Sequence, residues 1–197
     1  MKKVKLSTSY RKLLADTLTP VSIYLKLRDK FANSILLESS DYHGNDNTFS
    51  YICFQPMASF TLQSGQISIQ LPGREEKIHH MAQGEEAVIT SLTEFVDTFE
   101  VDPDIFNFPQ NGLFGYTCYD SVRYFEDLDI QHYADENYQI PDMLYQVYQY
   151  IIAIDHYKNE LYLFCHDYEA PTSSRKLDEI VDIINNLNIP AYGFQLS

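Results

Sequence analysis

Residues 34–40 read Ser-Ile-Leu-Leu-Glu-Ser-Ser, three apolar side chains followed directly by an acid and two hydroxyls. A continuous apolar run of this kind is typical of a strand buried on both faces. Glu38 then stands where the strand leaves the core, and its carboxylate must be solvated, paired or ligand-bound because burying a lone charge is costly. Such a carboxylate can bind an amino group while Ser39 supplies a neutral hydrogen bond. By themselves these residues favour a plainer interpretation, a strand end that faces water.

Composition describes a folded, acidic chain of 197 residues, in which 21% are charged and the formal net charge is −14. Duplex nucleic acid and anionic membranes attract proteins of the opposite sign, so both are disfavoured as partners. The length suits one sizeable core or two small ones. No composition break marks an internal boundary, so we expect a single domain over 1–197.

The cysteines and histidines show no metal or redox spacing. Cys53, Cys118 and Cys165 are far apart and lie in apolar or aromatic runs, which favours buried free thiols and a reducing, cytoplasmic compartment. The pair His79-His80 is adjacent in sequence, so its side chains diverge and a solvated loop over Pro72–Glu86 is the better interpretation. Only short apolar runs follow Met1-Lys2-Lys3 and no apolar segment reaches 18 residues, so we expect neither a signal peptide nor a membrane span.

Hydrophobic periodicity predicts both strands and helices. Expected strands alternate or run apolar, with hairpin turns at Ser64-Gly65 and Lys158-Asn159; they cover 2–6, 35–37, 49–55, 58–62, 66–71, 144–156 and 161–165. Expected helices begin at cap residues and carry an apolar stripe; they cover 20–31 after Thr19, 92–100 after Ser91, and the segment from about 173 to Pro190. We therefore expect an α+β fold, a mostly antiparallel sheet with helices packed on the outside.

Several stretches, taken in order, resemble anthranilate synthase component I, a chorismate-utilising family. Each motif is loose alone, but together they extend from about Asp16 to His156. The matching stretches are Leu36–Ser39 (LLES), Asp16–Leu27 (D-x-x-T-P-V-x-x-Y-x-K-L), Ser50–Ile52 with Pro56, Gly112–Glu126 (G-L-x-G-Y-x-x-Y-D-x-x-R-x-x-E), Pro141-Asp142 and Ile154–His156.

The resemblance implies the N-terminal portion of the anthranilate/aminodeoxychorismate synthase type of fold. It implies a Mg²⁺-dependent lyase that makes anthranilate and pyruvate from chorismate and ammonia or glutamine, with a glutamine amidotransferase subunit, anthranilate synthase component II, as partner. It also implies feedback inhibition by L-tryptophan bound through Glu38 and Ser39. The catalytic residues, the metal ligands and the rest of the effector pocket would lie in a C-terminal region expected to follow near Phe194. This chain is then a truncated fragment, inactive alone, with no catalytic or metal-binding residue of its own.

The sequence also departs from the family pattern. Asn47-Thr48 stands where the family often has Gly-Arg, and Phe49 and Cys53 replace a Tyr and a Gly. A basic contact to the effector is therefore either lost or supplied from elsewhere.

Two alternative functions stay open. One is aminodeoxychorismate synthase component I of the folate pathway, which often has Asp at the position of Glu38. The other is a stand-alone, non-catalytic acidic binding module. For Asp120, Arg123 and Glu126, spaced i, i+3, i+6, the preferred interpretation is a local ion-pair ladder rather than catalysis.

Overall fold

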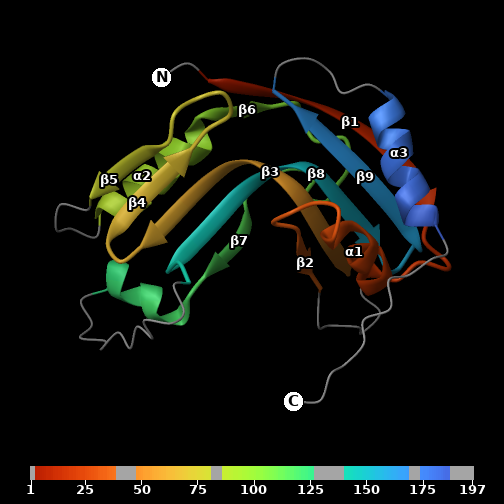
Figure 1. Cartoon of the computed structure of the whole chain (residues 1–197), viewed down its shortest axis with the longest axis horizontal. Coiled ribbons are helices and arrows are strands. Elements are labelled where there is room, and N and C mark those ends of the chain that lie inside the picture. The colour runs from red at the N-terminus through yellow and green to blue at the C-terminus, as the bar shows by residue number, and fades with distance from the viewer. Residues whose placement is uncertain (1–2, 39–47, 81–85, 127–139, 169–173, 187–197) are drawn as a thin grey trace.

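The computed structural model describes residues 3–38, 48–80, 86–126, 140–168 and 174–186. In that part of the chain, α-helices and one 3-10 helix flank an arched sheet of nine strands (Figure 1). The bounds of the strands are β1 Val4–Leu14, β2 Ile35–Leu37, β3 Phe49–Gln63, β4 Gln66–Gln70, β5 Lys77–His80, β6 Phe99–Val101, β7 Phe114–Thr117, β8 Met143–Asp155 and β9 Glu160–Asp167. The helices are α1 Pro20–Arg28, α2 Glu86–Asp97, η1 Tyr119–Tyr124 and α3 Ser174–Asn185.

The longest strands, β3 and β8, form the spine of the sheet and lie side by side along the arch (Figure 1). They pair antiparallel from Phe49 opposite Asp155 to Leu62 opposite Met143. Both are rich in aromatic and β-branched residues, which suit a pleated surface covered on both faces. Their neighbours follow through the two expected hairpins, β3 to β4 and β8 to β9, and both hairpins are confirmed. The turn at Ser64-Gly65 is as expected, whereas the turn between β8 and β9 comprises residues 156–159 and not only Lys158-Asn159.

The complete strand order is β5-β4-β3-β8-β9-β1-β6, with β2 added to β3 and β7 added to β8. Every pairing among the described strands is antiparallel except β1 with β6, which is parallel. The expected antiparallel sheet is therefore confirmed apart from this one pair.

A β-bulge between Pro56 and Ala58 divides β3 into two halves. Before the bulge Ile52 faces Ile152 of β8, and after it Phe60 faces Tyr145. Because Ile152 and Tyr145 are seven residues apart on one strand, their side chains point to opposite faces of the sheet. The bulge therefore places the buried side chains of the first half of β3 on one face of the sheet and those of the second half on the opposite face.

The helices follow this division. α1 and α3 pack on the cluster that contains Ile52, and α2 packs on the cluster that contains Phe60. Thr19 caps α1 as expected, since its side chain accepts a hydrogen bond from the backbone N–H of Ser22. Buried Lys26 of α1 donates from Nζ to the backbone oxygen of Ile184, 2.7 Å away, near the C-terminal end of α3. Burial lowers the pKa of Lys26.

A layer of aromatic rings covers the remaining face of β8 and β9. Phe106 and Phe108, from the segment after β6, stack on each other with centroids 5.3 Å apart. Phe106 also meets Tyr162 edge-on at 4.8 Å, and Phe108 lies 6.2 Å from Phe164. Geometries of this kind add to the stabilisation that apolar burial already provides.

Several strand predictions need correction. The expected edge strand over 2–6 is the start of an eleven-residue interior strand, β1, which lies between β9 and β6. The expected burial of 35–37 on both faces is also wrong, because β2 lies at the margin of the sheet and Leu37 is 40% exposed. Part of the expected loop over Pro72–Glu86 is strand β5, which pairs with β4.

The helix boundaries need correction as well. α1 ends at Arg28 instead of Phe31. α2 begins at Glu86, so Ser91 lies inside the helix and is no cap. Phe99 and Glu100, expected as the last residues of this helix, belong to β6.

Gly115 of β7 has no room for a side chain, because a Cβ built there would lie 1.9 Å from the backbone oxygen of Leu144. We expect Gly115→Ala to lower the free energy of unfolding by about 3 kcal/mol or more, since the backbone of β7 or β8 must shift. Gly65→Ala is the control: its φ of +75° is strained for alanine but the space is open, so the cost should be about 1–2 kcal/mol. Urea denaturation measures both, and equal losses would contradict the steric explanation.

Candidate functional site

Glu38 lies one residue beyond the end of β2 and is exposed. Leu36 pairs with Ile52 and Leu37 with Tyr51, so the ladder carries Glu38 toward the beginning of β3. Within the described residues, the carboxylate of Glu38 has no hydrogen-bond or ion-pair partner. The structure therefore shows the plainer arrangement considered from the sequence, a strand end followed by a solvent-exposed acid.

Ser39, the second predicted site residue, and the loop residues 41–47 lie outside the described residues. The role assigned to Ser39 stays a prediction.

Two other polar motif residues lie in the same corner. Ser50 of β3 and His156, just after β8, come together because Phe49 pairs with Asp155 and Ser50 with Ile154. The Ser50 hydroxyl and His156 Nε2 are 2.7 Å apart, and the His156 backbone N–H donates to the Thr48 oxygen at 3.1 Å. Parts of three stretches singled out in the sequence, residues 36–38, 50–52 and 154–156, thus converge at one end of the spine.

The Ser50–His156 contact has the length of a nucleophile–base pair, but its surroundings argue against catalysis. Ser50 is 1% exposed, so no substrate can reach its hydroxyl. The neighbouring carboxylate of Asp155 accepts hydrogen bonds from the backbone N–H groups of Tyr157 and Lys158 instead of orienting the imidazole ring. We therefore assign the pair to holding the ends of β3 and β8 together.

The same end of the sheet buries a tyrosine hydroxyl. Tyr51 stands opposite Leu37, and its ring lies 5.7 Å from that of Phe114. Among the described residues its hydroxyl has no hydrogen-bond partner. Burial raises the pKa of Tyr51 to about 12, so the group stays a neutral donor at physiological pH.

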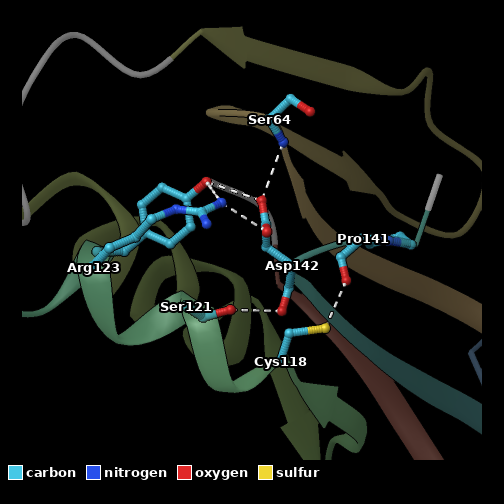
Figure 2. A network of polar contacts seen from close by, with 7 residues as sticks. Ser64, Cys118, Ser121, Arg123, Pro141 and Asp142 are labelled. Atoms are coloured by element: carbon cyan, nitrogen blue, oxygen red, sulfur yellow. Dashed lines mark hydrogen bonds and ion pairs between the residues drawn. The ribbon is translucent and has the colours of Figure 1, made fainter. Parts of the chain in front are cut away.

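A buried ion pair organises the opposite end of the spine (Figure 2). Arg123 of η1 donates from Nη2 to Asp142 Oδ1 at 2.8 Å, and their side chains are 17% and 6% exposed. Asp142 Oδ2 accepts from the Tyr124 hydroxyl at 2.9 Å and from the Ser64 backbone N–H at 3.1 Å. The Ser121 hydroxyl donates to the Asp142 backbone oxygen at 2.7 Å.

This network, centred on Asp142, joins three segments: η1, the turn between β3 and β4, and the residue before β8 (Figure 2). Sequence reasoning placed Arg123 in a local ladder with Asp120 and Glu126, and missed its partner 19 residues away. The available signal was Asp142 itself, which directly precedes a long apolar strand. A carboxylate buried at such a position needs a hydrogen-bond or ion-pair partner. The Asp142 carboxylate is satisfied by protein groups, whereas Arg123 Nη1 is buried without a hydrogen-bond partner among the described residues. Because the network ties three segments of the chain together, its evident role is structural.

Another buried polar cluster surrounds His166 of β9. Its Nε2 lies 3.0 Å from the Gln110 backbone oxygen, and its Nδ1 lies 3.0 Å from the Thr8 hydroxyl. A carbonyl only accepts, so Nε2 carries the proton and Nδ1 accepts from Thr8. Burial lowers the pKa of His166, against the opposing effect of the Asp167 and Asp102 carboxylates. The imidazole is therefore neutral at physiological pH.

The thiols and metal-ligating groups offer no further site in the described part of the chain. Cys53 and Cys165 are buried free thiols, as expected, and Cys118 is half-buried. Burial raises the pKa of Cys53, which keeps its thiol protonated. No group of three or more His, Cys, Asp or Glu side chains is placed to hold a metal ion there. No described helix is long and apolar enough to cross a membrane.

Comparison with known proteins identifies relatives that share one name. No protein-family model matches the chain. The anthranilate synthase component 1 of Thermus thermophilus is 34% identical over 155 residues, which cover 78% of this chain and 31% of the relative. That of Lactococcus lactis is 28% identical over 177 residues, 89% of this chain and 34% of the relative. The chain thus spans about a third of the length of these curated relatives.

A solved structure bears the same name. The crystal structure of anthranilate synthase component I from Streptococcus pneumoniae aligns over 91% of this chain and 37% of its own, with a TM-score of 0.48 and 20% identity.

The Asp142 network generates a stability prediction. Asp142→Ala leaves the buried guanidinium of Arg123 without its counter-charge, so the free energy of unfolding should fall by about 3–5 kcal/mol. The control is Asp178→Ala, which removes the partner of Arg11 in an ion pair whose side chains are 39% and 62% exposed. That loss should stay below about 1 kcal/mol. Urea denaturation separates the two, and a loss for Asp142→Ala no larger than the control would refute the assignment.

Proposed function

The chain is a homologue of anthranilate synthase component 1 over most of its length, and from this relationship we propose that it forms the N-terminal, feedback-regulatory part of such an enzyme. The observation that carries the proposal is the identity with the Thermus thermophilus protein along more than three quarters of the chain. Because the chain spans about a third of that relative, catalysis belongs in this proposal to the larger protein. The chain alone is expected to be inactive.

The proposed reaction of the larger, cytoplasmic protein is that of a lyase in tryptophan biosynthesis. Chorismate and ammonia are converted to anthranilate, pyruvate and water, and a glutamine amidotransferase subunit supplies the ammonia. Mg²⁺ belongs to the proposal as a cofactor that the larger protein binds. The described residues offer no three-ligand cluster for it, so none of the steps proposed for this chain uses the metal.

The regulatory part of the proposal concerns Glu38. Its carboxylate is exposed and unpaired among the described residues, so it is available to accept charge-assisted hydrogen bonds from the α-ammonium group of L-tryptophan. Leu37, 40% exposed beside it, offers apolar surface to the same ligand. The neighbouring Ser39 supplies a neutral hydrogen bond in this proposal, and the rest of the pocket comes from the remainder of the enzyme.

Inhibition follows from differential binding. Tryptophan that contacts both this chain and the chorismate-binding part of the enzyme stabilises one relative arrangement of these two parts. If chorismate binds that arrangement more weakly, tryptophan lowers the affinity for chorismate. The β2 segment is suited to this role because it is attached to the spine by only three residue pairs and ends in solvent. Small shifts of β2 therefore leave the core of the sheet undisturbed.

The activity is tested on the complete gene product that contains this chain, supplied with chorismate, Mg²⁺ and ammonium. Anthranilate, followed by its fluorescence, should appear and should decrease as L-tryptophan is added. Chorismate consumed without anthranilate would contradict the proposal and indicate the aminodeoxychorismate-forming relative. The 197-residue chain assayed alone should give no turnover above the blank.

The effector contact is tested by Glu38→Gln in the same protein. Losing one charge-assisted contact should raise the tryptophan concentration that halves the rate by about 10- to 100-fold. Glu100→Gln, which neutralises another exposed acid, on β6, is the matched control and should leave that concentration unchanged. If inhibition by tryptophan is the same in both variants, Glu38 is not an effector ligand.

A further inference from the structure

A largely apolar cavity of about 210 Å³ lies between β1, α2, β6, β8, β9 and residues 111–113, and β2 contributes nothing to its lining. Its inner wall is buried: Leu6 and Ile151 are each 1% exposed and Val147 is 6% exposed. Val96 of α2 and Val101 of β6 also line it and are 46% and 43% exposed, so they stand at its mouth. The cavity is therefore open to solvent on one side and is separate from the corner that contains Glu38.

The polar side chains of the lining, those of Asn111, Tyr148 and His166, each make a hydrogen bond within the protein, and Asn111 donates from Nδ2 to Asp104 Oδ1 at 3.4 Å. Both ring nitrogens of His166 have partners, the Gln110 carbonyl and the Thr8 hydroxyl. The hydroxyl of Tyr148 donates to Gln146 Oε1 at 2.7 Å. The lining contains no Lys, Arg, Asp or Glu side chain, so nothing in it compensates the charge of an ionic ligand.

The volume sets the size of the occupant. Protein interiors are packed as densely as organic crystals, and an unfilled cavity forfeits the contacts of its lining atoms. An apolar cavity of about 150 Å³ is known to bind benzene. The present cavity is larger, so one six-membered ring fits with room for a substituent or a fused ring.

From the volume and this lining we infer that the cavity is a binding site for a small, uncharged, apolar molecule of one or two rings. Phe99 contributes an aromatic ring to the lining, which favours an aromatic occupant through edge or offset contacts. The site is independent of the proposed effector contact at Glu38, since none of residues 34–38 lines it.

Fluorobenzene tests the inference in the complete gene product by ¹⁹F NMR. We expect saturable line broadening with a dissociation constant of about 1 mM or below, as suits so few ligand atoms. Benzene should reverse the broadening, and excess L-tryptophan should not. 4-Fluorobenzoate, of similar size but charged, should bind at least tenfold more weakly. Absence of saturable broadening, or equal binding of the benzoate, would overturn the proposal.

Two variants on one helix locate the binding. Val96→Trp at the mouth should weaken fluorobenzene binding at least tenfold, whereas Ile89→Trp, exposed on α2 but outside the lining, should leave it unchanged. Val101→Trp, on β6, approaches the mouth from the other side and should repeat the loss if Val96→Trp does not fold. Binding retained in every folded mouth variant, or lost equally in Ile89→Trp, would place the probe elsewhere and refute the site.

Discussion

The antiparallel pairing of β3 with β8 is the constraint on which the rest of the structure depends. Through it, residues 49–62 and 143–155 become one twisted surface, and the other strands are added to its margins. Each of the three apolar clusters formed by the described residues contains residues of both strands. The helices do not determine this surface but cover it, α1 and α3 at one end and α2 at the other (Figure 1).

Each end of the spine satisfies its polar groups in a different way. At the end near Asp142, a carboxylate and a guanidinium are buried together, and backbone and hydroxyl groups use the remaining acceptors. At the other end, Ser50 and His156 satisfy each other in the interior while Glu38 is left in solvent. The Asp142 carboxylate is therefore satisfied internally, although Arg123 Nη1 beside it has no hydrogen-bond partner among the described residues. At the other end, the carboxylate of Glu38 is exposed and has no partner among the described residues.

Much of the fold was predictable because its signals are local. Both hairpins were predicted from two-residue turns, and the start of α1 from Thr19 with the following proline. The parallel partner of β1 was not, because β6 has three residues and lies about 95 residues away in sequence. The exposure of Leu37 was missed for a related reason: an apolar run predicts a strand, but not whether that strand lies at the margin of the sheet. For the site, Glu38 was singled out from the sequence and its effector role stays a prediction, whereas the Ser50–His156 and Arg123–Asp142 pairs depend on tertiary contacts.

The bulge in β3 has a consequence for how this protein tolerates changes in chain length. Gln55, beside the bulge, adopts a left-handed conformation with φ of 59°, and the extra residue reverses the alternation of the strand from Ala58 onward. Deleting the extra residue itself would leave Ile52 opposite Ile152 and Phe60 opposite Tyr145, because the ladder closes at the bulge and both halves keep their partners. Deleting Ser59, after the bulge, would instead turn Phe60 and Leu62 outward and Thr61 inward if the rest of the pairing is kept. The effect of a one-residue deletion in β3 therefore depends on where the deletion falls relative to the bulge.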